Sequence, residues 1–199
     1  MDALTRRSVL AAATALTFVA CGPMVALLHG AGRAQRGAPV DAKNAGLPQT
    51  LTYDVFQVSN DGTRKPLGQS IRQYRPGTDV LVEDMPSGAK SKTLSLDHDL
   101  VLVVDVYREP RLEGFGLSVH GGGGSPAFSW EWFDLEKDDV FRKRQGTGKA
   151  RVSVANDAGR QELIAVEFLE DITLRLIDFK TGNRVEIVIR KDSVLRLRP

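Results

Sequence analysis

Two serines and a histidine in the middle of the chain are residue types that could carry out nucleophilic catalysis. Ser118 and Ser125 bear hydroxyl groups, and His120 between them could act as the base that accepts a hydroxyl proton. A complete catalytic set also needs a carboxylate, which would have to come from a remote part of the chain. Because adjacent positions of a strand point to opposite faces, we expect these groups to be dispersed. We therefore predict no catalytic residue.

The glycine run beside His120 has a second reading. Residues 120–125 read His-Gly-Gly-Gly-Gly-Ser, which resembles the oxyanion loop of lipases and esterases, where glycines let backbone N–H groups face a developing negative oxygen. Those enzymes also use a Gly-x-Ser-x-Gly turn, and residues 68–72 and 116–120 each lack its second glycine. We interpret the run as a flexible loop and keep a serine hydrolase near His120 as an alternative.

Two acidic segments could be considered as metal sites. In the triplet 97–99, Asp-His-Asp, an extended chain would turn the carboxylates and the imidazole to opposite sides, which favours a polar turn. The acidic residues between 131 and 139 lack the Asp-x-Asp-x-Asp-Gly spacing of calcium loops and have the basic run 142–144 beside them. We interpret the acidic stretch as a solvated, salt-bridged loop and the basic run as a solvated strand or loop. We predict no metal site and no cofactor.

Three aromatic residues lie two positions apart and would share one face of a strand. They are Phe128, Trp130 and Trp132. Aromatic side chains at this spacing usually fill a core, but in an open barrel the same row would line an apolar pocket. We predict these three residues, together with Tyr53 and Phe115, as candidate ligand-binding residues.

The first residues have the pattern of a removable export signal. Residues 5–10 read Thr-Arg-Arg-Ser-Val-Leu and resemble the twin-arginine export signal, with Val in place of the more usual Phe. An uncharged, alanine-rich segment runs on to Leu28, and small residues up to Ala34 offer a cleavage site. We predict an export signal over 1–34 and a periplasmic location.

Two alternatives would leave the protein attached to a membrane. The apolar segment is long enough to cross a bilayer uncleaved, although Gly22-Pro23 in its middle disfavours an anchor. Residues 18–22, Phe-Val-Ala-Cys-Gly, resemble a lipoprotein box in which Cys21 would be lipidated. We expect membrane contact only in these two cases.

Charge and cysteine content restrict the function of the remaining chain. Of 27 Lys and Arg and 25 Asp and Glu, the predicted signal contains Arg6, Arg7, Arg33 and Asp2, which leaves 24 of each. A neutral balance gives no support for nucleic-acid binding. Cys21 is the only cysteine, so an internal disulfide is excluded. Cleavage after Cys21 would also remove thiol catalysis and every cysteine-based metal site.

Short runs of alternating apolar and polar residues predict a β domain over 50–199, after a flexible linker over 35–49. Turn-forming clusters separate the runs, for example Asn-Asp-Gly-Thr at 60–63. The predicted strands are 51–58, 67–74, 80–83, 92–96, 100–107, 114–120, 127–133, 151–155, 162–170, 173–179, 184–190 and 193–198. About a dozen short strands indicate an all-β fold, either an antiparallel β-barrel or a β-sandwich, which share the same alternation.

These features together predict an exported envelope protein with a non-enzymatic binding or accessory role. Its partner would be an apolar small molecule or another envelope protein. The alternatives are the serine hydrolase near His120 and a structural lipoprotein tethered through Cys21.

Overall fold

The structure, a computed structural model, describes residues 46–107, 110–121, 128–177 and 184–199, with the side chains of Phe128, Ser129 and Asp157 outside the description. The predicted export signal over 1–34, with Cys21, and most of the predicted linker lie outside the described residues. No helix among the described residues is long and apolar enough to cross a bilayer.

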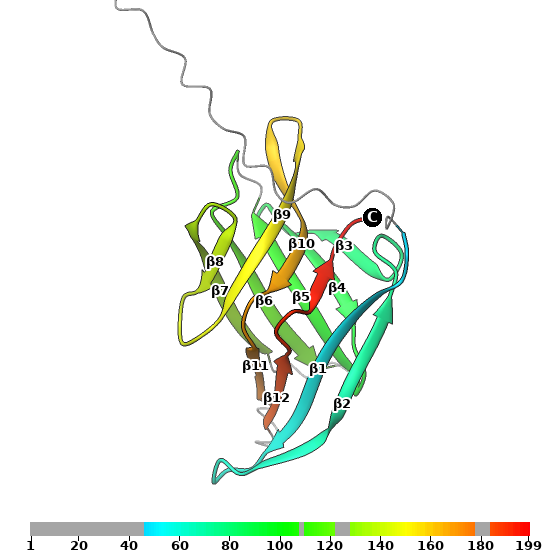
Figure 1. The fold of residues 1–199 in the computed structure, drawn as a ribbon, viewed down its shortest axis with the longest axis vertical. Coiled ribbons are helices and arrows are strands. Elements are labelled where there is room, and N and C mark those ends of the chain that lie inside the picture. The colour runs from blue at the N-terminus through cyan, green and yellow to red at the C-terminus, as the bar shows by residue number, and fades with distance from the viewer. Residues whose placement is uncertain (1–45, 108–109, 122–127, 178–183) are drawn as a thin grey trace, which may run out of the picture. The chain divides into compact units, whose positions relative to one another are not determined.

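The described residues form thirteen strands in two antiparallel sheets, which confirms the all-β prediction (Figure 1). One sheet has four strands in the order β11-β12-β1-β2, and the other has nine in the order β13-β10-β9-β8-β7-β6-β5-β4-β3. The strands are β1 (Gln49–Val58), β2 (Arg64–Tyr74), β3 (Val80–Asp84), β4 (Ala89–Ser95), β5 (Leu100–Tyr107), β6 (Gly114–Gly121), β7 (Phe128–Lys137), β8 (Val140–Lys143), β9 (Lys149–Asp157), β10 (Arg160–Phe168), β11 (Ile172–Ile177), β12 (Arg184–Ile189) and β13 (Val194–Arg196).

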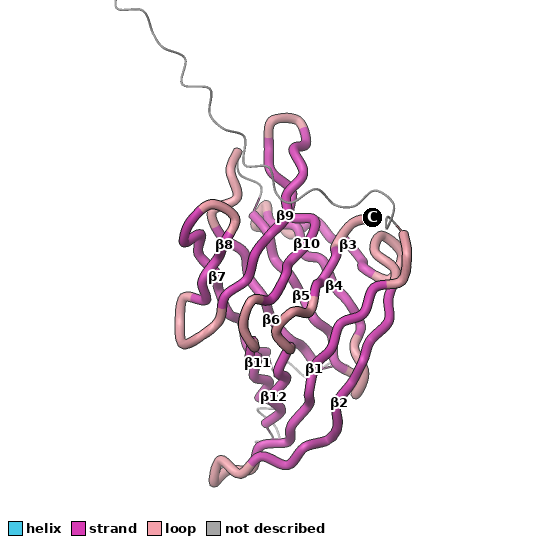
Figure 2. Tube along the Cα trace, viewed as in Figure 1, coloured by secondary structure: helices cyan, strands magenta, loops and turns pink. Residues whose placement is uncertain are grey.

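The nine-stranded sheet is a meander from β3 to β10 that curls into a half-barrel. Its strands β9, β10 and β13 pass in front of β4, β5 and β6 (Figures 1 and 2). A hydrogen bond from Lys92 of β4 to Glu162 of β10 joins strands that do not pair with each other in the sheet. The sequence pattern is compatible with both a barrel and a sandwich. The nine-stranded sheet adopts a curled form between these two architectures.

Both sheets contribute to one apolar core. Phe115 and Phe133 stack at its centre with ring centroids 4.8 Å apart, and Phe141 packs at 5.6 Å from Phe115. Strand β5 lies inside the sheet between β4 and β6, and its outward face is only partly covered, since Tyr107 there is exposed. Its residue Leu102 belongs to the core, and Val103 is buried on the opposite face.

Tight turns place the strands as the sequence predicts. At 60–63, Gly62 has φ 85°, and the Thr63 N–H donates to Asp61 Oδ1 at 2.9 Å. In the turn before β5, His98 and Asp99 both have positive φ, 60° and 53°, as in the type I′ turns that suit hairpins. The polar-turn interpretation of 97–99 is therefore confirmed.

The acidic stretch between 131 and 139 is strand for most of its length, which corrects its prediction as a loop. Strand β7 continues to Lys137, and β8 forms a hairpin with it. The predicted salt bridges are present, because Arg142 and Arg144 each lie 2.7 Å from a carboxylate oxygen of β7. Lys143 between them is only 6% exposed, so the solvated interpretation is wrong for this residue. It lies two positions after buried Phe141 and shares its inward face.

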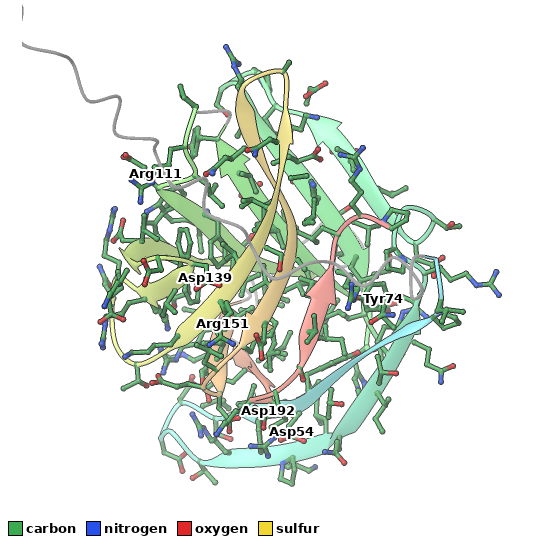
Figure 3. All side chains as sticks on the ribbon, turned by 45° about the horizontal axis from the view of Figure 1, so that its top comes forward. Asp54, Tyr74, Arg111, Asp139, Arg151 and Asp192 are labelled. Atoms are coloured by element: carbon green, nitrogen blue, oxygen red, sulfur yellow. The ribbon has the colours of Figure 1, made fainter. Side chains whose placement is uncertain are left out.

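A buried tyrosine joins the two sheets near the C-terminus. The Tyr74 hydroxyl of β2 accepts a hydrogen bond from the Arg196 backbone N–H at 2.7 Å and donates to the Val194 carbonyl at 3.4 Å. Figure 3 shows Tyr74 beside the C-terminal strand. Burial raises the pKa of Tyr74 to about 12, so its hydroxyl remains a donor throughout the physiological range.

Candidate functional site

The five predicted ligand-binding residues do not lie together. Tyr53 and Phe115 are fully buried in the core, and the side chain of Phe128 lies outside the described residues. Trp130 and Trp132 lie on the outward face of β7, on the side away from Phe133. The structure therefore brings the two tryptophans together and separates them from Tyr53 and Phe115.

Tyr53 holds a turn in place. Its hydroxyl donates to Asp97 Oδ2 at 3.2 Å and accepts the Asp97 backbone N–H at 2.9 Å. Burial raises the pKa of Tyr53, which keeps the hydroxyl protonated for the first of these bonds. The contact anchors the turn between β4 and β5 against β1.

The outward face of β5, β6 and β7 carries a row of aromatic rings. We call Tyr107, Trp132 and Trp130 the aromatic surface. The centroid distances along the row are 5.8 Å from Tyr107 to Trp132 and 5.3 Å from Trp132 to Trp130. A cavity of about 230 Å³ adjoins it, lined by Tyr107, Glu113, Gly114, Trp132, Asp134 and Arg144.

Ser118 and His120 are in contact, which contradicts the expected dispersal of the catalytic candidates. They lie two positions apart on β6 and therefore share a face, with Ser118 Oγ 3.1 Å from His120 Nε2. Burial lowers the pKa of His120, against the opposing charge of Asp105. Ser118 is only 1% exposed and lines neither the cavity beside Trp132 nor the one beside Lys92, so its hydroxyl is shielded from a substrate. Ser125 lies outside the described residues.

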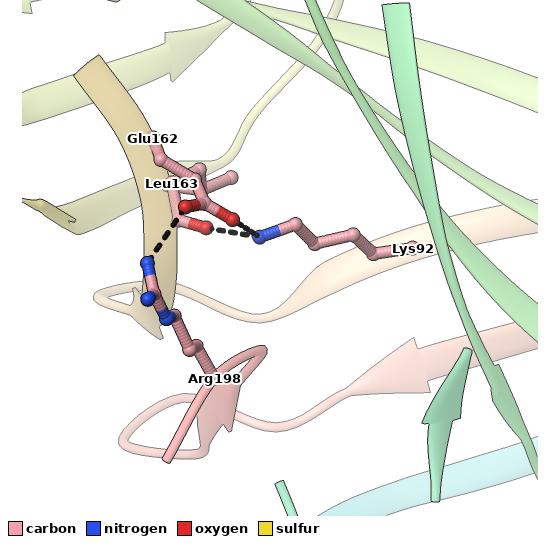
Figure 4. Close-up of polar contacts among 4 residues, drawn as sticks. All are labelled: Lys92, Glu162, Leu163 and Arg198. Atoms are coloured by element: carbon pink, nitrogen blue, oxygen red, sulfur yellow. Dashed lines mark hydrogen bonds and ion pairs between the residues drawn. The ribbon is translucent and has the colours of Figure 1, made fainter. Parts of the chain in front are cut away.

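A buried lysine is the residue that sequence reasoning missed. Lys92 of β4 is 2% exposed, and its ammonium donates to Glu162 Oε1 at 2.9 Å and to the Leu163 carbonyl at 2.7 Å (Figure 4). Arg198 donates to the other oxygen of Glu162 at 2.9 Å. The only local signal is the period of two, which places Lys92 on the same face as core residue Leu94.

A cavity of about 250 Å³ lies beside this lysine, between β4 and β5 on one side and β10 on the other. We call it the Lys92 pocket. Val106, Leu163 and Ala158 supply apolar wall, while the remaining lining residues are polar or charged. The full lining is Lys90, Lys92, Val106, Ala158, Arg160, Gln161, Glu162 and Leu163. Three cationic side chains and one carboxylate give the lining an excess of positive charge.

The charges in the Lys92 pocket perturb one another. Burial lowers the pKa of Lys92 and outweighs the opposite effect of Glu162, and the nearby positive charges of Lys90 and Arg198 add to the lowering. Burial by itself would raise the pKa of Glu162, but the Lys92 hydrogen bond and the charges of Lys92 and Arg198 lower it. A perturbed ionisable pair beside a cavity is a common feature of functional sites.

The described part of the chain holds no group of three His, Cys, Asp or Glu side chains placed to share a metal ion. No family model matches this chain, and neither a curated protein nor a solved structure matches it.

Proposed function

We propose that this chain is an exported envelope protein with a non-enzymatic role, and that its β domain binds a small amphipathic anion in the Lys92 pocket. The observation that carries the proposal is the buried ammonium of Lys92 in the pocket wall. An ammonium has three N–H donors, and Glu162 and Leu163 accept two of them. The third is available to a ligand carboxylate.

Charge and volume support this ligand class. Lys90, Lys92 and Arg160 outnumber Glu162 in the lining, and opposite charges attract more strongly where water is partly excluded. Val106 and Leu163 offer an apolar wall to the rest of the ligand. A pocket of about 250 Å³ has room for a short-chain ligand of this kind. A straight-chain carboxylate such as hexanoate or octanoate meets these requirements.

Isothermal titration of the protein with octanoate tests the proposal. We expect octanoate to bind and its uncharged analogue octanol to bind at least about tenfold more weakly, because a lost charge-assisted hydrogen bond is worth roughly 1.5–3 kcal/mol. Lys92→Met should abolish the preference for octanoate. Lys143→Met is the matched control, since Lys143 is also buried and paired with a glutamate but does not line the pocket. Equal binding of octanoate and octanol would refute the proposed ligand class.

The envelope location rests on the first 34 residues and has its own test. Replacing Arg6 and Arg7 by lysine should block export, because the paired arginines carry the resemblance to the twin-arginine signal. The intact mass of the exported protein should correspond to a chain cleaved near Ala34. A product carrying a diacylglycerol on Cys21 would instead support the tethered lipoprotein, and one of full length would support the uncleaved anchor.

A serine hydrolase is the second candidate function, and one observation favours it. Ser118 Oγ and His120 Nε2 are 3.1 Å apart, within the range for a nucleophile and its base. The burial of Ser118 disfavours it. Incubation with a fluorophosphonate separates the two functions, because we expect no labelling, and labelling that disappears in Ser118→Ala would establish the hydrolase.

A further inference from the structure

Both tryptophans of this chain lie outside the core. The sequence contains two, and large aromatic side chains ordinarily bury most of their area. Trp130 is instead 46% exposed and Tyr107 is 41% exposed, with Trp132 half-buried between them. The rings form a continuous aromatic surface that is open to solvent.

The neighbouring strand is shaped to hold these rings. Trp132 lies over Gly114 and Trp130 over Gly116, and a Cβ at either glycine would lie 2.5 Å from the indole above it. The Trp132 Nε1–H donates to Asp134 Oδ1 at 2.8 Å. The guanidinium of Arg144 lies 5.8 Å from the Trp132 ring centroid, within the range of a cation–π contact. These contacts fix the ring before any ligand arrives.

Packing against Gly114 and Gly116 explains why one face of each indole is buried. It does not explain why the aromatic surface as a whole is exposed. The groups around the adjacent cavity are polar, with the carboxylates of Glu113 and Asp134 and the guanidinium of Arg144. A ligand for this surface therefore needs a flat C–H face to lie on the rings and hydroxyl groups at its edge to reach the charged side chains. A sugar ring has both, and a cavity of about 230 Å³ is large enough for one.

We infer that the aromatic surface and its cavity form a glycan-binding site, separate from the Lys92 pocket, in which a pyranose ring stacks on the exposed indole of Trp130 beside Trp132. Asp134 and Arg144 would bond the ring hydroxyls. The inference does not depend on the proposed function, because the aromatic surface lies on the outward face of the sheet and Lys92 on the inward face.

Intrinsic fluorescence tests the inference directly, because both fluorescent tryptophans of the chain lie in the proposed site. The full-length protein is titrated with cellotriose, maltotriose and N,N′,N″-triacetylchitotriose at millimolar concentrations. We expect at least one of these sugars to shift or quench the emission in a saturable manner. No saturable change with any of the three would overturn the inference.

Variants separate stacking from general effects. Trp130→Ala should weaken sugar binding by about tenfold or more, because it removes one stacked ring, while Trp132 remains as the reporter. Gly116→Ala should also weaken binding, since its methyl group would displace the Trp130 ring. Leu81→Ala, at an apolar residue of β3 that is 62% exposed, should bind as wild type. Unchanged affinity in Trp130→Ala, with circular dichroism showing a folded protein, would overturn the inference.

The two proposed sites can fail independently. Lys92→Met should retain the fluorescence response to the sugar, and Trp130→Ala should retain the calorimetric response to octanoate. Loss of both responses in either variant would show that the two sites are not separate, and would overturn that part of the inference.

Discussion

The two buried lysines of this β domain make a useful comparison. Lys92 and Lys143 lie on inward faces of the nine-stranded sheet and are 2% and 6% exposed. Each bonds a glutamate and a backbone carbonyl, but the distances differ. The two contacts of the Lys92 ammonium measure 2.9 and 2.7 Å, whereas those of Lys143 measure 3.3 Å to Glu131 and 3.4 Å to the Thr173 carbonyl.

The surroundings of the two lysines differ more than their partners do. Lys143 of β8 reaches to β11 and so connects the two sheets, and Gly148 packs so closely that a Cβ there would lie 3.3 Å from the Lys143 Cβ. Lys92 borders a cavity of about 250 Å³. Lys143 therefore connects the two sheets, whereas Lys92 is a candidate binding residue. The difference between them is the cavity that borders Lys92.

Removing each glutamate should give the largest effect and should distinguish the two lysines. Glu131→Ala leaves Lys143 buried without its carboxylate, which should lower the free energy of unfolding by about 3–5 kcal/mol. Glu162→Ala should cost less, about 1–3 kcal/mol, because water in the Lys92 pocket can solvate the ammonium. Urea denaturation of both variants measures the difference. A larger loss for Glu162→Ala would contradict the view that the pocket is accessible to water.

The dependence of the free energy of unfolding on alkaline pH should reveal the lowered pKa of Lys92. Because burial lowers the folded pKa of Lys92 below 10.5, the unfolded chain holds this proton over a pH range in which the folded protein has lost it. Stability should therefore rise with pH from the lowered pKa up to about 10.5. Lys92→Met should lack this rise, as measured by the urea midpoint at each pH.

Tyrosines provide an internal check on that experiment. The raised pKa values of Tyr53 and Tyr74 act in the opposite direction, because only the unfolded chain loses these protons as the pH passes 10.0. The same loss occurs in wild type and in Lys92→Met. The difference between the two curves therefore isolates the lysine, and a flat difference would contradict the assigned shift.

Protonation of His120, on the outward face of β6, should change the free energy of unfolding by a smaller amount at acid pH. Burial lowers its folded pKa, so as the pH falls through 6.5 the unfolded chain takes up a proton that the folded protein resists. Stability should fall over this range, and His120→Gln should reduce the slope. Parallel curves for the two proteins below pH 6.5 would show that His120 is not the group responsible.

The smallest effect should come from an exposed ion pair. Asp134 and Arg144 are 47% and 58% exposed, although their bond measures 2.7 Å. Since solvent screens such pairs, Asp134→Asn should leave the urea midpoint almost unchanged, in contrast to both glutamate variants. A loss comparable to that of Glu162→Ala would show that exposure does not set the strength of these pairs.

Elements with a strong local pattern could be predicted from the sequence. The bounds of β5 at Leu100–Tyr107 agree with the prediction because an unbroken apolar run from Leu100 to Val104 marks the strand and a polar turn precedes it. Strand β8, Val140–Lys143, was missed because four residues in a charged stretch contain too few apolar positions to show a period of two. The turn at 60–63 followed directly from Asp-Gly.

The candidate sites could be predicted only in part. Alternation placed Trp130 and Trp132 on one face of β7, but a period of two does not say which face is covered, and the neighbouring Phe133 occupies the core instead. The Lys92 pocket joins residues 70 positions apart, Lys92 and Glu162. Contact between these two residues depends on the curvature of the sheet, and no local pattern in the sequence encodes that curvature.

The pairing of β1 with β12 constrains the order in which this protein folds. Tyr53 at the start of the domain lies opposite Ile189 near its end, and Tyr74 of β2 bonds the backbone of β13. The first hairpin therefore cannot find these neighbours until residues 184–196 have left the ribosome. Such distant pairings fold slowly and leave strand edges unpaired in the meantime. A chain lacking residues 185–199 would lose β12, the partner of β1, and would leave that edge of β1 exposed.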